Sequence, residues 1–199
     1  MSLALCDEFE GGFGWTEPGF LERTSHALEV RGEVLVFDPV DMPGIDQRIR
    51  LLGEPGAVVQ LLDRHERDSA AVAARLGVPH LRMELDSHGG ASRLVRIVWN
   101  RVWKEVAFWE PERRVLVVAD AVGPVGYFTA PGEAIGVHPL LRLRPPRDLG
   151  ELEPEHILCG HGAGVHGPAA AVALREALAT SRRRLPRALA GSLRRRKSG

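Results

Sequence analysis

The chain has 199 residues, of which 44% are apolar and 26% are charged, and its formal net charge is zero. This length can bury one sizeable core, but it is too short for two ordinary domains and a linker. No run approaches the roughly 20 apolar residues of a membrane span, and the first four residues are followed at once by Cys6, Asp7 and Glu8, which is not typical of a signal peptide. We therefore expect a soluble, cytoplasmic, single-domain protein without a membrane partner.

Basic residues are concentrated at the C-terminus. Residues 181–199 hold eight Arg or Lys and no acid, whereas the preceding 180 residues hold 18 basic and 26 acidic groups. We predict a folded domain at residues 1–184 and a basic tail at residues 185–199. Such a tail can bind nucleic acid or an anionic membrane. No aromatic residue lies between the arginines to stack on bases, so we favour a solvated helix end and expect no nucleic-acid partner.

The first half of the chain alternates strand-like and helix-like segments. Residues 24–30 and 33–38 flank the turn residues Arg31 and Gly32, which predicts an antiparallel hairpin. Apolar spacing then predicts a helix at 45–52, a strand at 57–62, a helix at 69–76 and a strand near 79–83. The composition of the Gly-rich segment 9–20, and that of residues 86–92, is typical of loops.

The second half begins with three apolar or alternating segments at 94–99, 103–109 and 114–119. They predict consecutive antiparallel strands. Residues 122–150 are rich in Gly and Pro and indicate a long rim segment. A short strand at 156–159, a Gly-rich loop at 160–167 and an Ala-rich helix at 168–182 complete the chain.

Polar residues gather where three predicted strands end. His65 and its charged neighbours follow the strand at 57–62, Asp120 follows the strand at 114–119, and His161 lies between two glycines after the last strand. The carboxyl ends of strands are where α/β proteins place their functional loops. Glycine on both sides of His161 also allows a close approach of the backbone.

These segments, in this order, resemble the metallo-β-lactamase fold superfamily. The features that carry the resemblance are a hairpin ending in Asp38, a strand running into a His/Asp loop, Ala119 followed by Asp120, and the Gly-His-Gly turn at His161. The match runs from about Ala27 to the last helix. It implies a single α/β (α+β) domain built as a four-layer αββα sandwich, with a metal site at one edge of its two sheets.

The metal-binding loop of that family, H-x-H-x-D-H, is altered here. The resemblance places Asp63 at the first His, His65 at the second, Arg67 at the Asp and Asp68 at the last His. Asp120 matches the Asp that bridges two metal ions, and His161 matches the late His. A further His is expected before Asp120, but the corresponding residues 98–103 contain none.

Three residues of suitable type therefore remain at matching positions, namely His65, Asp120 and His161. Zinc sites use three or four neutral or deprotonated ligands, whereas the guanidinium of Arg67 stays protonated and opposes a nearby dication. We predict that Arg67 replaces a metal ion by pairing with Asp120, and with Asp63 or Asp68.

Structural roles compete with these assignments. Asp68 precedes a helix and suits an N-cap, Asp63 can form a charge network with Arg64, and Asp120 can form a turn. His65 can point to solvent. The remaining candidates, which lie outside the matched motifs and for which we expect surface positions, are His88, His138 and His166.

Two functions follow. In the first, which we prefer because of Arg67, the chain has lost the binuclear centre and needs no cofactor. It is then a binding or structural protein that recognises an anionic small molecule through Arg67, Asp63 and His161. In the second, one zinc, iron or manganese ion is held by His65, Asp120, His161 and Asp68. Asp120 and His65 are then the catalytic residues of a hydrolase of a small ester, thioester or phosphoester. The oligomeric state is left open.

Overall fold

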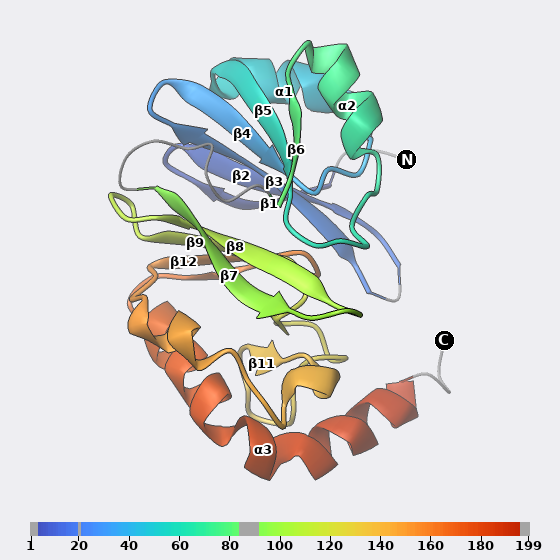
Figure 1. The fold of residues 1–199 in the computed structure, drawn as a ribbon, viewed down its shortest axis with the longest axis vertical. Helices are drawn as coiled ribbons and strands as arrows, with labels where there is room; N and C mark the ends of the chain where they lie inside the picture. The colour runs from blue at the N-terminus through green and yellow to red at the C-terminus, as the bar shows by residue number, and fades with distance from the viewer. Residues whose placement is uncertain (1–3, 20, 84–91, 196–199) are drawn as a thin grey trace.

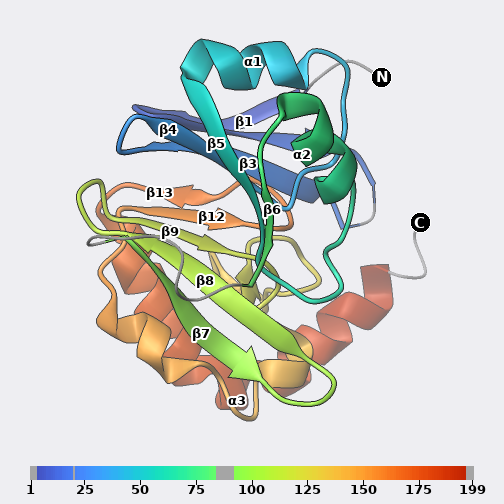
Figure 2. The same ribbon diagram turned by 45° about the horizontal axis from the view of Figure 1, so that its top comes forward.

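The computed structural model describes residues 4–19, 21–83 and 92–195, with side chains through residue 188. The chain forms a four-layer αββα sandwich, which confirms the predicted architecture (Figure 1). Helices α1 and α2 cover one sheet, and helix α3 with two short 3₁₀ segments covers the other (Figure 2). The predicted loop at 86–92 lies, except for Ser92, outside the described residues. No helix in the described part of the chain combines the length and the apolar character needed to cross a membrane.

The N-terminal sheet has six strands in the order β1-β2-β3-β4-β5-β6, and two helices connect its last three strands. The pairing β4–β5–β6 is parallel, as those helical connections require, whereas the first four strands are antiparallel. Its elements are β1 (Ala4–Phe9), β2 (Gly12–Glu17), β3 (Arg23–Val30), β4 (Glu33–Phe37), α1 (Ile45–Leu52), β5 (Glu54–Gln60), α2 (Ser69–Leu76) and β6 (His80–Arg82).

The C-terminal sheet has five strands in the order β13-β12-β9-β8-β7, in which β12 runs parallel to β9. The predicted run of three antiparallel strands is confirmed. Residues 122–150 form short strands and 3₁₀ turns. The elements of this half are β7 (Arg93–Trp99), β8 (Lys104–Glu110), β9 (Val115–Val118), β10 (Val122–Gly123), β11 (Gly136–Val137), β12 (His156–Cys159), β13 (Val165–His166) and α3 (Ala169–Arg195).

The prediction of a loop at residues 9–20 is wrong, because most of this segment is strand. Gly11, with φ of 78°, forms the turn between β1 and β2. Within β2, Gly12 and Gly14 have no room for a side chain because neighbouring side chains pack against their backbone. Phe13 and Trp15 between them are buried in the core. The glycines therefore mark close packing within a strand, not an irregular loop.

Helix α3 continues through the predicted start of the basic tail. It runs to Arg195 and includes Pro186, and Ala188 is fully buried. The helix therefore extends beyond residue 184.

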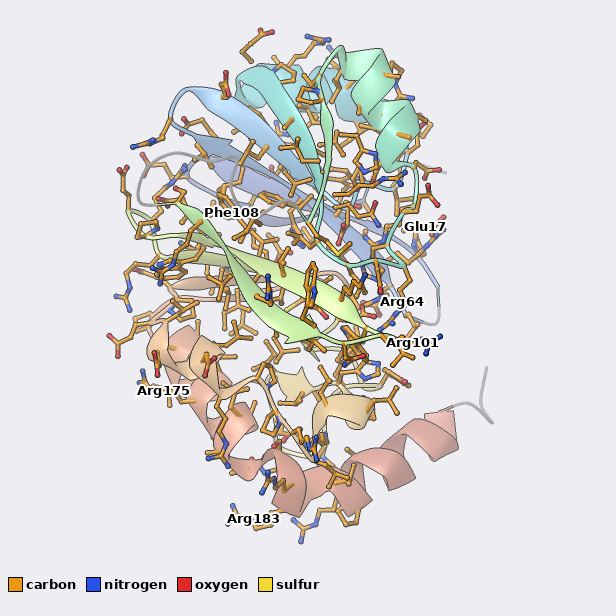
Figure 3. The ribbon with its side chains drawn as sticks, viewed as in Figure 1. Glu17, Arg64, Arg101, Phe108, Arg175 and Arg183 are labelled. Atoms are coloured by element: carbon orange, nitrogen blue, oxygen red, sulfur yellow. The ribbon has the colours of Figure 1, made fainter. Side chains whose placement is uncertain are left out.

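The central core lies between the two sheets. Phe37 of β4 and Phe108 of β8 meet there with ring centroids 5.0 Å apart, and Phe108 is labelled in Figure 3. At one edge the sheets are also joined by hydrogen bonds. Thr24 N donates to Gly160 O over 2.9 Å, and Val106 N donates to Leu61 O over 2.9 Å. These contacts join β3 to the end of β12 and β8 to the end of β5, and β9 ends beside β12 because the two strands pair in parallel.

Candidate metal centre

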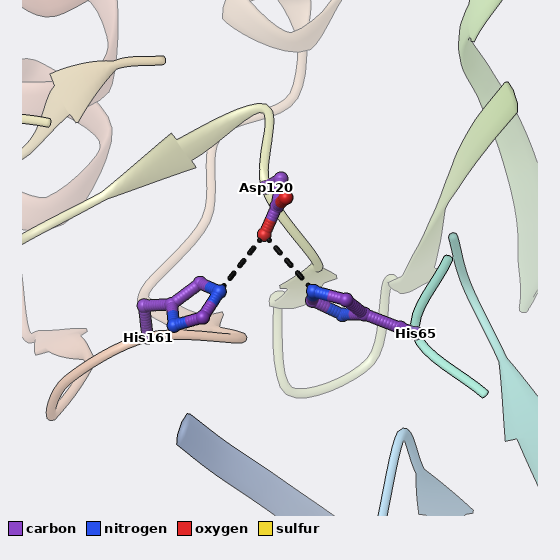
Figure 4. Close-up of side chains that lie close together, drawn as sticks. All are labelled: His65, Asp120 and His161. Atoms are coloured by element: carbon purple, nitrogen blue, oxygen red, sulfur yellow. Dashed lines mark ion pairs between the residues drawn. The ribbon is translucent and has the colours of Figure 1, made fainter. Parts of the chain in front are cut away.

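His65, Asp120 and His161 converge at this edge, as the sequence predicts (Figure 4). Each residue follows the end of a different strand, namely β5, β9 and β12. The Nε2 atoms of both histidines lie 3.1 Å from Oδ1 of Asp120. All three side chains are buried, so the alternative in which His65 points to solvent is wrong.

The outer nitrogen of each imidazole is fixed by a hydrogen-bond acceptor. Nδ1 of His161 lies 2.8 Å from Leu21 O, a carbonyl that only accepts, so Nδ1 carries the proton. Nδ1 of His65 lies 3.1 Å from Oδ2 of Asp38, the residue that ends the β3–β4 hairpin. Metal-ligating histidines are oriented by acceptors of this kind. The Nε2 atoms of both rings therefore face Asp120.

Asp38 is itself held firmly. Its backbone has a φ of 43°, which is unusual for a residue with a side chain, and its Oδ1 accepts a hydrogen bond of 2.9 Å from Leu61 N. The carboxylate that orients His65 is therefore tied to the strand from which the His65 loop departs.

A positive charge beside the buried Asp120 carboxylate would be electrostatically favourable. Oδ1 of Asp120 is buried and makes no hydrogen bond, although two imidazole nitrogens face it. Burial alone raises the pKa of the Asp120 carboxyl, but His161 and His65 outweigh burial and hold it well below its usual range. Burial and Arg67 lower the pKa of His65, whereas Asp120 and Asp38 raise it, and the net shift is upward.

The arrangement fits one metal ion. Ligand atoms about 2.0 Å from a tetrahedral zinc ion lie about 3.3 Å apart, close to the separation of each Nε2 from Oδ1. Within the described residues, this is the one group of three or more potential ligands whose donor atoms all lie within 4.8 Å of one another. Two imidazoles and a carboxylate suit zinc, iron or manganese.

Arg67 does not pair with Asp120, contrary to the prediction. Its guanidinium donates to three backbone carbonyl oxygens, at 2.6 Å to Thr24, 2.9 Å to Asp38 and 2.8 Å to Gly160. The φ of Arg67 is 41°, a left-handed conformation that is uncommon for a residue with a side chain. The cation is therefore used to join backbone segments of the two sheets.

The structure does not bring Asp63 and Asp68 to the three convergent residues. Oδ2 of Asp63 accepts a hydrogen bond of 3.1 Å from Lys104 N, and Oδ1 lies 3.9 Å from Arg64, which confirms the alternative of a charge network. Asp68 occupies the N-cap position of α2. Its side chain accepts from Asp41 N over 2.8 Å and makes no capping hydrogen bond to the helix.

Arg64, one residue before His65, is the arginine beside Asp120. Its Nε lies 3.8 Å from Oδ2 of Asp120, and its guanidinium lies 4.1 Å from the centroid of the Trp103 ring. Figure 3 shows Arg64 on the same side of the molecule as Arg101 in the β7–β8 hairpin. The sequence predicted that Arg67 would pair with Asp120, but the arginine beside Asp120 is Arg64, three positions earlier in the loop.

Glu105 is a second residue that sequence reasoning missed. It is fully buried, and its Oε1 accepts hydrogen bonds of 2.9 Å from the backbone nitrogens of Asp120 and Ala121. Its Oε2 accepts from Trp103 Nε1 over 2.8 Å. Burial, followed by Asp120, raises the pKa of Glu105 to about 7. The detectable signal was a glutamate directly before the apolar run 106–109 of β8.

His138 is buried, so the expected surface position is wrong. Its ring contacts Trp103, Tyr127 and Phe128 edge-on, with centroids 4.7 to 5.4 Å apart. Burial lowers the pKa of His138 to about 4. Phe128 also packs against His161. His138 thus forms part of an aromatic wall beside the centre. His88 lies outside the described residues.

No family model and no curated protein match this sequence. Solved structures do match over most of the chain. A metallo-β-lactamase from Pontibacter korlensis is 12% identical with a TM-score of 0.61, over 89% of this chain and 99% of that one. The chain has the metallo-β-lactamase fold. FIM-1 from Pseudomonas aeruginosa, described in a mono-zinc form, is also 12% identical with a TM-score of 0.61, over 92% and 97% of the two chains.

A third match to this metallo-β-lactamase fold comes from Erythrobacter litoralis, with 11% identity, a TM-score of 0.58, and coverage of 91% of this chain and 92% of that one. Identities this low establish the fold alone.

Replacing Arg67 with methionine should lower the free energy of unfolding by about 3 to 5 kcal/mol, because it leaves three carbonyl oxygens without their charged donor. Denaturant unfolding measures this change. Arg64→Met is the matched control and should cost less than about 1 kcal/mol, since Arg64 makes long, partly exposed contacts. Equal losses in both variants would contradict the structural role of Arg67.

Proposed function

We propose that this protein holds one divalent metal ion at His65, Asp120 and His161 and hydrolyses a small ester, thioester or phosphoester. One observation carries the proposal. Oδ1 of Asp120 is buried without a hydrogen bond, and two imidazole nitrogens, whose partner nitrogens are occupied by acceptors, face it. A cation shared by the three atoms resolves this arrangement.

A single ion is favoured over two. The positions that would complete a second ion's ligands hold Asp63, Arg67 and Asp68, whose side chains are engaged by backbone groups. The mono-zinc form of FIM-1 is consistent with one ion in this fold. The proposal thus keeps the expected loss of a binuclear centre but retains metal chemistry.

The three residues divide the work as follows. A divalent ion supplies Lewis-acid chemistry, since it polarises a carbonyl or phosphoryl oxygen and makes water more acidic. His65 and His161 contribute neutral ligands, and Oδ1 of Asp120 the anionic one. Oδ2 of Asp120 then serves as proton acceptor, and the hydrogen bonds from the Asp120 and Ala121 amides to Glu105 keep this carboxylate in place.

The substrate in this proposal is anionic, and Arg64 recognises it. The Arg64 guanidinium makes one long hydrogen bond, of 3.5 Å to Val102 O, and its side chain is 43% exposed. Stacking on Trp103 fixes its plane, so that donors remain available to a carboxylate or phosphate. Arg67 has no such capacity, because backbone carbonyls occupy its guanidinium.

Elemental analysis tests the metal. Protein purified without chelator and dialysed against metal-free buffer should keep about one equivalent of a transition metal per chain. His161→Ala and Asp120→Asn should lose it, whereas the control His80→Ala, a change in β6, should not. Absence of metal from the wild-type protein, or its retention in both site variants, would refute the proposal.

Arg64→Met tests the substrate class. The ratio of kcat/KM for an anionic ester to that for a neutral ester of similar size should fall about 10- to 100-fold, because a charge-assisted contact worth about 1.5 to 3 kcal/mol is lost. Arg101→Met, in the nearby hairpin, provides the matched control. An unchanged ratio would assign recognition to another group.

A second function is supported by the raised pKa of His65. In a binding protein without metal, a protonated His65 between Asp38 and Asp120 supplies the positive charge instead. The histidines then contribute to binding an anionic ligand, and no hydrolysis follows.

The pH dependence of stability separates the two functions. A histidine whose pKa is higher in the folded than in the unfolded state stabilises below its unfolded pKa of about 6.5 and loses that contribution as pH rises through the folded value. Chelator-treated protein should therefore become less stable above about pH 6.5, and His65→Gln should flatten this dependence. If added metal does not restore stability at the higher pH, the binding protein is the better account.

A further inference from the structure

A second pair of histidines lies at the opposite side of the C-terminal sheet from the β7 edge. His156 in β12 and His166 in β13 are directly opposed in the antiparallel register. Their Nδ1 atoms lie 2.9 Å apart. Figure 2 shows β12 and β13 side by side below the N-terminal sheet. The side chain of His166 is 34% exposed, so the pair is open to solvent.

Residues of the N-terminal strand β1 fix both rings. Nε2 of His166 lies 2.9 Å from Oδ1 of Asp7, a carboxylate that is only 2% exposed. The Phe9 ring stacks on His156, with centroids 4.4 Å apart and planes 15° apart. Two histidines on different strands are thus oriented by two side chains from a third.

The backbone conformation of Asp7 sets the direction of its carboxylate. Its φ is 54°, at an irregularity in the β1–β2 register, and its Oδ1 also accepts a hydrogen bond of 2.6 Å from Gly164 N. Bulges of this kind redirect side chains, and strained backbone is often found at binding sites. The carboxylate lies on the nitrogen of His166 that is remote from His156, as in carboxylate–histidine–metal sites.

The spacing matches a chelate. Two imidazole nitrogens about 2.0 to 2.1 Å from one ion, at a right angle, lie about 2.9 Å apart. In the absence of an ion, one proton shared between the two Nδ1 atoms accounts for the same distance. An ion that replaces this proton releases it to solvent, and water completes the coordination on the exposed side.

We propose that His156 and His166 form a surface site for a divalent transition-metal ion, separate from the candidate metal centre and independent of the proposed function. Imidazole ligands select ions such as Zn²⁺, Ni²⁺ and Cu²⁺, and Cu²⁺ binds most tightly in that series. The site uses Asp7 to orient His166 and Phe9 to orient His156.

Titration of the full chain with Cu²⁺ alone tests the site, with electron paramagnetic resonance as the readout. In a His161→Ala background, one Cu²⁺ per chain should show hyperfine coupling to two imidazole nitrogens. His156→Gln and His166→Gln should each weaken binding at least about 10-fold, whereas the control His80→Gln should not. Binding that is unchanged in either pair variant, or weakened equally in the control, would overturn the proposal.

Two further measurements of Cu²⁺ binding keep the proposal testable if a variant does not fold. If His161→Ala does not fold, the wild-type protein should bind one more Cu²⁺ per chain than His166→Gln, whether or not the candidate metal centre binds an ion. Asp7→Asn retains the side-chain shape and removes the charge, so it should weaken Cu²⁺ binding about 10- to 100-fold. Full affinity in Asp7→Asn would show that the carboxylate does not support the site and would count against it.

Discussion

The tie between Arg67 and three backbone carbonyls holds the edge on which the rest of the site depends. Thr24 and Asp38 belong to the N-terminal sheet, and Gly160 belongs to the C-terminal sheet. A charged donor to carbonyl oxygens in a poorly solvated position is stronger than a neutral hydrogen bond. His161 follows directly after Gly160, and His65 lies two residues before Arg67. One guanidinium therefore fixes the backbone from which both histidines project.

With Arg67 engaged in this way, the charges of the centre are set by other residues. Oδ1 of Asp120 faces two imidazole nitrogens and Oδ2 faces Arg64, while Glu105 accepts hydrogen bonds from the backbone of Asp120 and Ala121. The Asp120 carboxylate therefore contacts side chains that follow strands of both sheets. Two arginines therefore have separate roles: Arg67 holds the backbone segments together, and Arg64 has donors that remain available to a ligand.

Much of the architecture could be predicted from the sequence, because alternating strand and helix patterns and the residues at strand ends are local signals. The convergence of His65, Asp120 and His161 followed from their positions after the ends of three different strands. The direction of the Arg67 side chain could not be predicted, since it depends on a left-handed φ and on carbonyls distant in the sequence. The strands β1 and β2 were missed because glycine indicates both loops and close packing.

The three convergent side chains come from both halves of the sandwich, so the proposed function couples metal affinity to folding. His65 is carried by the N-terminal sheet, whereas Asp120 and His161 follow neighbouring parallel strands of the C-terminal sheet. An ion that binds all three acts as a clamp across the interface where Phe37 meets Phe108. By thermodynamic linkage, any change that loosens this interface weakens the affinity for the ion, even at a distance from the ligands.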